Sequence, residues 1–423
     1  MTAPGKLRVV VIGAGAAGLC AARHIAACPE SFAPPVVFEA SGRVGGTWVY
    51  TEETGQSPDG LPIHSSMYRD LRTNLPKEVM AFPDFPFDPS LPSFLHHSDV
   101  LAYLESYADH FCVREHIRFS WLVDAVSPAE GPEGGWDVTT CRAQDRTVQV
   151  TERFDAVIVC SGHYSDPFIP AIPGLETFPG RLLHSHEYRG PEPFAGRTVV
   201  LLGAGPSGVD LTLQLAPVAQ RVILSHRQPP LPPLPGNVLQ AMPAVAVAGD
   251  TVQFGDGAEH RADVLILCTG YRYPLPLPGA RPPGPADHGP HGDAAVSQIC
   301  PFPHFHCQLL FCLAVLRGAC RLPSAAARQA AAEGELRQHL AAGGAPRHFH
   351  QLGRRQWGYC QELARLGGFE PLPPVVRKLY EATQASRRQD VSSYRSLNYR
   401  VLSAEEWALV GADPGGKGAE DGR

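Results

Sequence analysis

The chain lacks the features that mark three broad classes of protein. None of its apolar runs approaches the roughly 20 residues that a membrane helix needs, and the longest candidate, from Leu309 to Leu316, suits a buried helix. A secretory leader is not expected, because a buried-strand pattern begins almost at once after Met1. The net charge of −6 at pH 7 argues against a nucleic-acid partner. We therefore expect a cytoplasmic protein with no membrane anchor and no nucleic-acid partner.

The 11 cysteines follow no regular spacing and contain no Cys-x-x-Cys pair. They indicate free thiols in a reducing compartment, and the missing pair argues against a disulfide reductase. Two cysteines and two histidines fall close together between Cys300 and Cys307. Their spacing fits no common zinc pattern, so we favour a packing role at the start of a helix and expect no metal site.

Two glycine fingerprints stand out against this background. The first, 13–18, follows the apolar run 9–12, and the second, 203–208, follows the apolar run 199–202. Each pattern predicts a buried strand, a tight turn and the start of a helix, where backbone N–H groups and the helix dipole attract a pyrophosphate. The first motif supplies Gly13, Gly15 and Gly18, and the second supplies Gly203, Gly205, Ser207 and Gly208. Two such motifs predict two dinucleotides and electron transfer between them.

The residue types at the ends of the second strands distinguish the two units. Glu39 ends the strand expected over 35–39, where a carboxylate accepts hydrogen bonds from an adenosine ribose. In the second unit, Ser225 and Arg227 follow the strand over 221–224. A hydroxyl and a guanidinium at this place favour a 2′-phosphate, which predicts NADPH. The alternatives are a solvated strand end for Glu39 and a surface arginine for Arg227.

Four further segments resemble the flavin-containing monooxygenase family. Residues 178–188 match its Phe-x-Gly-x-x-x-His-x-x-x-Tyr/Phe fingerprint, which lies between the two glycine motifs in that family as it does here. Residues 45–48 match its Gly-Gly-x-Trp segment, 73–86 match the segment with its active-site asparagine, and 268–271 match its Ala-Thr-Gly-Tyr region. The chain is similar to the short members of the family that include plant glucosinolate S-oxygenase-like proteins.

The resemblance implies a fold, two cofactors and a reaction. It implies an α/β fold with two Rossmann-like dinucleotide-binding domains, the NADPH domain inserted into the FAD domain. It also implies that NADPH reduces FAD, that O2 adds as a C4a-hydroperoxyflavin, and that nitrogen or sulfur of a small molecule takes one oxygen atom. Asn74 would lie over the flavin as the catalytic residue. Gly46, Trp48, Thr269 and Gly270 would border the cofactors. Taken without the resemblance, Asn74 is typical of a turn residue before Pro76.

The same comparison predicts domain boundaries. We expect a first part of the FAD domain over 1–166, the NADPH domain over 167–264, a second part of the FAD domain over 265–410, and a disordered tail over 411–423. The extended connector 166–174 marks the first crossover. The strand over 263–267 is expected to return the chain to the first domain. Helices are expected over 16–27, 324–341 and 354–366.

Two features of the sequence bear on the activity. The middle fingerprint ends in Tyr188-Arg189 where Baeyer–Villiger monooxygenases have Trp-Pro, and this difference favours N- or S-oxygenation. Within the same fingerprint, His184 is expected to pack at a domain linker. The stretch 276–292 is rich in proline and glycine and lacks the strand pattern of the family. An oxidase that releases hydrogen peroxide, or a catalytically silent nucleotide-binding relative, therefore remain alternatives. A homodimer is equally open.

Overall fold

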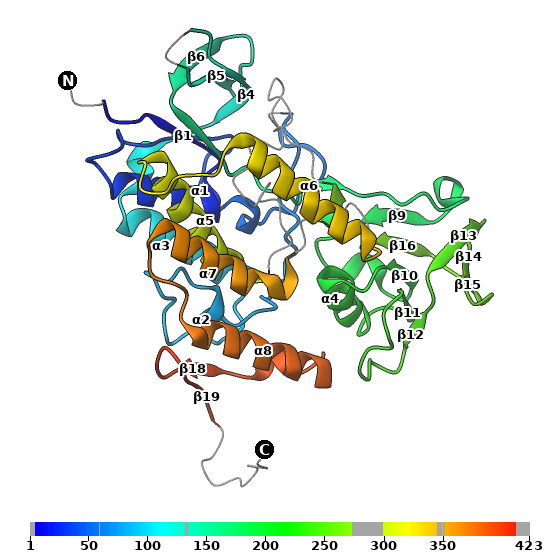
Figure 1. The fold of residues 1–423 in the computed structure, drawn as a ribbon. Coiled ribbons are helices and arrows are strands. Elements are labelled where there is room, and N and C mark those ends of the chain that lie inside the picture. The colour runs from blue at the N-terminus through cyan, green and yellow to red at the C-terminus, as the bar shows by residue number, and fades with distance from the viewer. Residues whose placement is uncertain are drawn as a thin grey trace.

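Two parallel sheets organise the chain (Figure 1). The computed structural model describes residues 5–58, 60–131, 134–272, 299–344, 349 and 352–411. The proline- and glycine-rich stretch 276–292 and the tail beyond Gly411 lie outside the described residues. Among the described helices, none is both long enough and apolar enough to cross a bilayer.

The first sheet carries the first glycine motif. Its four parallel strands have the order β3 (Ile117–Phe119), β2 (Val36–Glu39), β1 (Val9–Ile12) and β7 (Ala156–Val159). Val10 pairs with Val36 on one side and with Val157 on the other, so β1 is central. All four residues of β1 are buried, as a continuous apolar strand covered on both faces requires.

The second sheet carries the second glycine motif. Its five strands have the order β12 (Val238–Ala241), β11 (Arg221–Ser225), β10 (Thr198–Leu202), β16 (Val264–Leu267) and β9 (Arg181–His184). The strand β16 therefore belongs to the second unit, and the expectation that it returns the chain to the first domain is wrong. It pairs in parallel with both β10 and β9, so the expected boundary after residue 264 cuts through a buried strand.

The two units repeat one plan. Each has a strand, a helix and a second strand, then a three-stranded antiparallel sheet and a return strand. The helices are α1 (Ala16–Ala26) and α4 (Pro206–Leu215). The antiparallel sheets are β4 (Trp121–Pro128), β5 (Trp136–Arg142) and β6 (Gln149–Phe154) in the first unit, and β13 (Ala244–Ala248), β14 (Thr251–Phe254) and β15 (Glu259–Arg261) in the second. Figure 1 shows each antiparallel sheet at the outer side of its own unit.

The chain returns to the first unit through α5 (Pro301–Leu316). Phe302, Leu309 and Leu313 of this helix share one core with α1 and α3 (His97–His110). The second unit is thus inserted between β7 and α5, and the expected α/β fold with an inserted dinucleotide-binding domain is confirmed. The remaining helices and strands are α2 (Lys77–Met80), α6 (Ala325–Ala341), α7 (Gln356–Gly367), α8 (Pro374–Gln389), β8 (Asp166–Pro167), β17 (Tyr271–Arg272), β18 (Tyr399–Val401) and β19 (Trp407–Leu409).

Short 3-10 turns complete the path of the chain. They are η1 (Gly46–Trp48), η2 (Val113–His116), η3 (Leu175–Thr177), η4 (Ser185–Glu187), η5 (Glu192–Phe194), η7 (Gly353–Arg355) and η8 (Tyr394–Ser396). The connector 166–174 contains no helix, as its prolines predict. The helices expected over 16–27, 324–341 and 354–366 are α1, α6 and α7, with ends that differ by one or two residues.

Candidate nucleotide-binding site

The turn between β1 and α1 admits no side chain at its first and last glycines. A Cβ on Gly18 would lie 1.8 Å from the carbonyl oxygen of Gly13, and a Cβ on Gly13 would lie 2.6 Å from that of Cys160. Gly13 also has a φ of +103°, which L side chains rarely adopt. The helix therefore begins directly against the strand. No side chain caps its N-terminus at Gly15, so its first N–H groups are left for an anion.

The carboxylate of Glu39 bonds to the backbone of this turn. One carboxylate oxygen accepts a hydrogen bond from the backbone N–H of Ala14 at 2.7 Å, and the other accepts one from Ser41 at 2.8 Å. The residue is 9% exposed. Each carboxylate oxygen keeps a further acceptor site, because an ionised carboxylate has about four lone-pair positions. The predicted ribose-binding carboxylate is thus held at the end of β2, beside the first glycine turn.

A second glycine segment closes on the first. The N–H of Gly45 donates to the carbonyl of Ala14 at 3.1 Å, and a Cβ on Gly15 would lie 3.5 Å from the Cα of Gly46. Trp48 ends this segment, with its ring 6.4 Å from that of Phe302 on α5. The predicted residue Gly46 is therefore brought to the same turn as the first fingerprint, whereas Trp48 lies against α5.

The second glycine turn repeats the geometry of the first. A Cβ on Gly208 would lie 1.8 Å from the carbonyl oxygen of Gly203, which has a φ of +112°. A Cβ on Gly203 would lie 2.5 Å from the carbonyl oxygen of Cys268, which takes the place that Cys160 has in the first unit. Gly205 meets open space instead, and no side chain caps α4. Ser207 is exposed in the first turn of that helix.

Ser225, the last residue of β11, and Arg227, just beyond it, differ in their surroundings. Arg227 is exposed just beyond the end of the strand. The hydroxyl of Ser225 is buried, donates to the carbonyl of Met242 at 2.9 Å and accepts from the N–H of Ala244 at 3.0 Å. Since its only hydrogen is used within the chain, Ser225 links β11 to β13 and has no donor left for a phosphate. Its predicted role in phosphate binding is not supported by these hydrogen bonds.

Asn74 lies in a loop whose backbone is fixed from both sides. Thr73 before it exchanges two hydrogen bonds with Leu95, through its N–H at 2.8 Å and its hydroxyl at 3.0 Å. Pro76 after it caps α2. The Asn74 side chain is partly exposed and makes no hydrogen bond to the residues that the structure describes. The chain therefore presents this amide on a rigid loop with its donors and acceptor free.

Thr269 and Gly270 join β16 to the connector at the crossover. The Thr269 hydroxyl donates to the carbonyl of Phe168 at 2.5 Å, and the carbonyl of Gly270 accepts from the N–H of Phe168 at 2.9 Å and from the His184 ring at 3.1 Å. His184 is 4% exposed, and burial lowers its pKa to about 4. The packing role expected for His184 at the linker agrees with these contacts.

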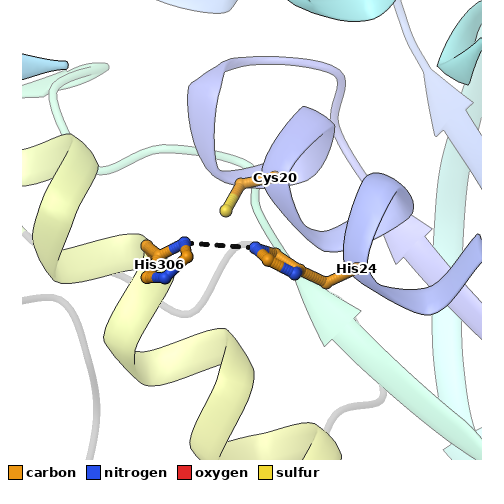
Figure 2. Close-up of side chains that lie close together, drawn as sticks. All are labelled: Cys20, His24 and His306. Carbon is orange, nitrogen blue, oxygen red and sulfur yellow. Dashed lines mark hydrogen bonds between the residues drawn. The ribbon is translucent and has the colours of Figure 1, made fainter. Parts of the chain in front are cut away.

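One cluster of buried side chains was missed by the sequence analysis. Cys20 and His24 lie one turn apart on α1, and His306 faces them from α5 (Figure 2). Their ligand atoms lie within 4.8 Å of one another. The sequence grouped His306 with Cys300 and His304 instead, but these residues point elsewhere because the segment is helical. Only the packing of α1 on α5 could have identified this group.

Hydrogen bonding explains the cluster without a metal. The guanidinium of Arg23 donates to Nδ1 of His24 at 2.6 Å and pairs with Asp84 at 2.5 Å. Because arginine cannot accept, the ring hydrogen of neutral His24 is on Nε2, which donates to Nδ1 of His306 at 3.2 Å. The nitrogen that faces the cluster therefore carries a hydrogen, whereas a metal ligand needs a lone pair there. Burial, and then the charge of Arg23, lower the pKa of His24 to about 2.

Comparisons with a family model, with known sequences and with solved structures identify relatives that agree with one another. A family model described as flavin-binding monooxygenase-like matches residues 6–230. Flavin-containing monooxygenase FMO GS-OX-like 4 of Arabidopsis thaliana is 34% identical, over 92% of this chain and 93% of its own length. The solved structure of S-allyl-L-cysteine S-oxygenase from Allium sativum matches with a TM-score of 0.84 and 31% identity, over 92% of this chain and 95% of that one. Tmm from a Pelagibacter species matches with a TM-score of 0.78 and 26% identity, over 92% of each chain.

The second glycine turn offers a matched pair of substitutions. Gly208→Ala places a methyl group against the Gly203 carbonyl and is expected to lower the free energy of unfolding by at least about 3 kcal/mol. Gly205→Ala meets no atom within 4 Å and is expected to change it by less than about 1 kcal/mol. Urea denaturation measures both. Equal losses for the two variants would contradict the steric account of this turn.

The buried His24 predicts a pH dependence of stability. The pKa of His24 is lower in the folded protein than in the unfolded chain, so only the unfolded chain takes up a proton as the pH falls. The free energy of unfolding therefore decreases as pH falls below about 6.5. From linkage, His24 alone is expected to account for a loss of about 1.4 kcal/mol between pH 7.5 and 5.5.

Urea denaturation of the parent and of His24→Gln at both pH values measures this difference. The fall in the free energy of unfolding should be smaller in the variant by about that amount. A His110→Gln variant, exposed at the end of α3, serves as the control and should follow the parent. An identical pH dependence in His24→Gln and the parent would show that His24 is not held neutral.

Proposed function

Because this chain belongs to the flavin-containing monooxygenase family, in the branch of the plant GS-OX-like enzymes, we propose that it uses NADPH and O2 to oxygenate a soft sulfur or nitrogen atom of a small molecule. For a thioether the reaction balances when NADPH, one proton, O2 and the thioether give NADP⁺, water and the sulfoxide. The single observation that carries this proposal is the pair of uncapped glycine turns in one chain, each shaped for a pyrophosphate.

The residues of the first unit fit FAD. The N-terminus of α1 supplies N–H groups for the pyrophosphate, and Gly13, Gly15 and Gly18 let the backbone approach it. Glu39, which is held beside this turn by the Ala14 N–H, would accept hydrogen bonds from the ribose. When bound, the flavin supplies the two-electron chemistry that joins NADPH to O2 and leaves one oxygen atom for the substrate. The protein contributes position, shape and the exclusion of water.

The residues of the second unit fit NADPH. The turn Gly203 to Gly208 and the exposed Ser207 lie at the N-terminus of α4, where a pyrophosphate is favoured. The exposed guanidinium of Arg227 would supply a positive charge for the 2′-phosphate. Ser225 would not contribute a hydrogen bond, because its hydroxyl hydrogen is bonded to the Met242 carbonyl. Thr269 and Gly270 bond to the connector and to His184, and would thereby help to position the second unit.

Among the described residues, three buried or half-buried histidines lie near the junction of the two units. Burial, as the largest cause, lowers the pKa of His64 and His186, and lowers that of His184 to about 4. These imidazoles are therefore uncharged at neutral pH. Because stray proton donors and water divert reduced flavin and O2 to hydrogen peroxide, neutral histidines favour coupled turnover. The uncharged amide of Asn74 fits the same requirement, since it orients an oxygen atom without readily protonating it.

The first experiment compares three quantities in one reaction: the NADPH consumed, the sulfoxide formed and the peroxide formed. Purified protein is given NADPH, O2 and a small thioether such as S-allyl-L-cysteine, after which the Allium sativum relative is named. We expect sulfoxide to form in proportion to the NADPH consumed, with little peroxide. If all NADPH appears as peroxide whatever sulfide or amine is added, the protein is an oxidase. If no NADPH is consumed, it is a nucleotide-binding relative without activity.

The cofactor preference depends on one side chain. Arg227→Ala is expected to raise KM for NADPH at least about tenfold and to leave KM for NADH unchanged, because only NADPH carries the 2′-phosphate. Steady-state kinetics with both nucleotides measures this. Arg221→Ala, at the opposite end of β11, is the matched control. Equal effects of Arg227→Ala on both nucleotides would rule out the proposed contact.

The amide of Asn74 is tested by an acid of the same shape. Asn74→Asp is expected to retain bound flavin but to lose at least about 90% of sulfoxide formation, with the electrons recovered as peroxide. Flavin absorbance after desalting, sulfoxide and peroxide are measured on the same sample. Product formation at the parent rate would remove Asn74 from the mechanism.

A further inference from the structure

A buried ion pair joins the second unit to the C-terminal segment. Asp210 lies on α4, the helix of the second glycine turn, and its side chain is 8% exposed. It accepts hydrogen bonds from the guanidinium of Arg395, which follows α8, and from the hydroxyl of Tyr68. A carboxylate this deeply buried is stable only when it is paired. Asp210 therefore depends on two residues that lie outside its own unit.

The same guanidinium contacts the loop of Asn74. Nε of Arg395 donates to the carbonyl of Thr73 at 3.0 Å, the residue directly before Asn74. The centre of the Tyr394 ring lies 5.3 Å from the guanidinium carbon and 5.2 Å from the centre of the Phe94 ring. Tyr394 therefore packs Arg395 beside the 94–95 segment that bonds to Thr73. One planar group thus touches both the loop of the proposed catalytic amide and the helix of the second nucleotide site.

The geometry requires arginine. Its donors are spread over a rigid fork, so Nη1 reaches Asp210 while Nε reaches Thr73, and a lysine has only one nitrogen to serve both. Burial first, and then the charge of Asp210, raise the pKa of Tyr68 well above its usual value, so the phenol remains a donor to the carboxylate. The network has one arrangement of donors and acceptors, and that arrangement fixes the distance between α4 and the Asn74 loop.

We propose that Arg395 is a positioning residue for the monooxygenase reaction, which holds the Asn74 amide in register with the nucleotide bound at α4. This inference rests on the proposed function, because it assigns Asn74 and α4 to one reaction. It predicts that loss of the bridge loosens the Asn74 loop and weakens NADP⁺ binding although neither Arg395 nor Asp210 is assigned a contact with the nucleotide.

The test uses full-length protein with bound flavin. The variants are Arg395→Gln, Asp210→Asn, the double variant and Arg395→Lys, and the control is Lys378→Gln, which removes an exposed ion pair with Glu405 in the same C-terminal region. Hydrogen exchange of the backbone amides of residues 72–75 reports the loop, and calorimetric titration with NADP⁺ reports the second site. The fraction of NADPH electrons lost as peroxide reports coupling.

We expect Arg395→Gln and Asp210→Asn each to speed exchange of the loop and to weaken NADP⁺ binding by at least about tenfold, with a larger peroxide fraction. The double variant should show the same loop exchange and NADP⁺ affinity as Arg395→Gln, because both substitutions remove the same ion pair. Lys378→Gln should stay within about twofold of the parent. The proposal is overturned if Arg395→Gln leaves exchange and NADP⁺ affinity within about twofold of the parent, even when its Tm falls.

Arg395→Lys decides the matter if Arg395→Gln does not fold. It keeps the charge beside Asp210, so it should fold, but it should still exchange faster at residues 72–75 because one nitrogen cannot serve both partners. Exchange at the parent rate would overturn the proposal. A parent protein that binds no NADP⁺ would refute the proposed function and this inference with it, whereas unchanged loop exchange in a parent that binds NADP⁺ would refute the inference alone.

Discussion

The rest of the structure depends on one steric constraint, which the chain meets twice. At Gly18 and at Gly208 a helix passes so close to the preceding turn that a Cβ would lie 1.8 Å from a carbonyl oxygen. This contact brings the first turn of each helix to the end of a central strand and leaves its N–H groups uncapped. The other features follow from it. A return strand places Cys160 or Cys268 beneath the turn, a second strand ends at Glu39 or Ser225, and an antiparallel sheet covers the outer face of each unit.

Two copies of one nucleotide site become an enzyme only if their separation is fixed. On one side, the Gly270–Phe168–His184 contacts bind the connector between the units to the inserted second unit. On the other side, the guanidinium of Arg395 bridges Asp210 and the loop of Asn74. Since misplacement of reacting groups by about 1 Å costs roughly a hundredfold in rate, these connections bear directly on whether electrons from NADPH reach the substrate or are lost as peroxide. The comparisons with known proteins identify the chain as a flavin-dependent monooxygenase.

Local patterns predicted the parts of the site that are local. The glycine spacing fixes turns within six residues, and Glu39 is found because it ends the next strand. The partners that lie far apart in sequence could not be predicted: His24 and His306 are 282 residues apart, and Asp210 and Arg395 are 185 apart. Strand β16 was assigned to the wrong sheet because a buried apolar strand carries no record of its neighbours. Ser225 has the right residue type for phosphate binding, but its hydroxyl bonds to the backbone of 242 and 244, which no spacing rule reveals.

The central claim is that both glycine sites hold their nucleotides at once and that electrons pass between them. The most direct measurement is the absorbance of the bound flavin when NADPH is added in the absence of O2. We expect purified protein to be yellow after desalting, to lose the flavin absorbance on addition of NADPH, and to recover it when air is admitted. Protein that stays colourless after incubation with FAD, or bound flavin whose absorbance NADPH leaves unchanged, would contradict the account.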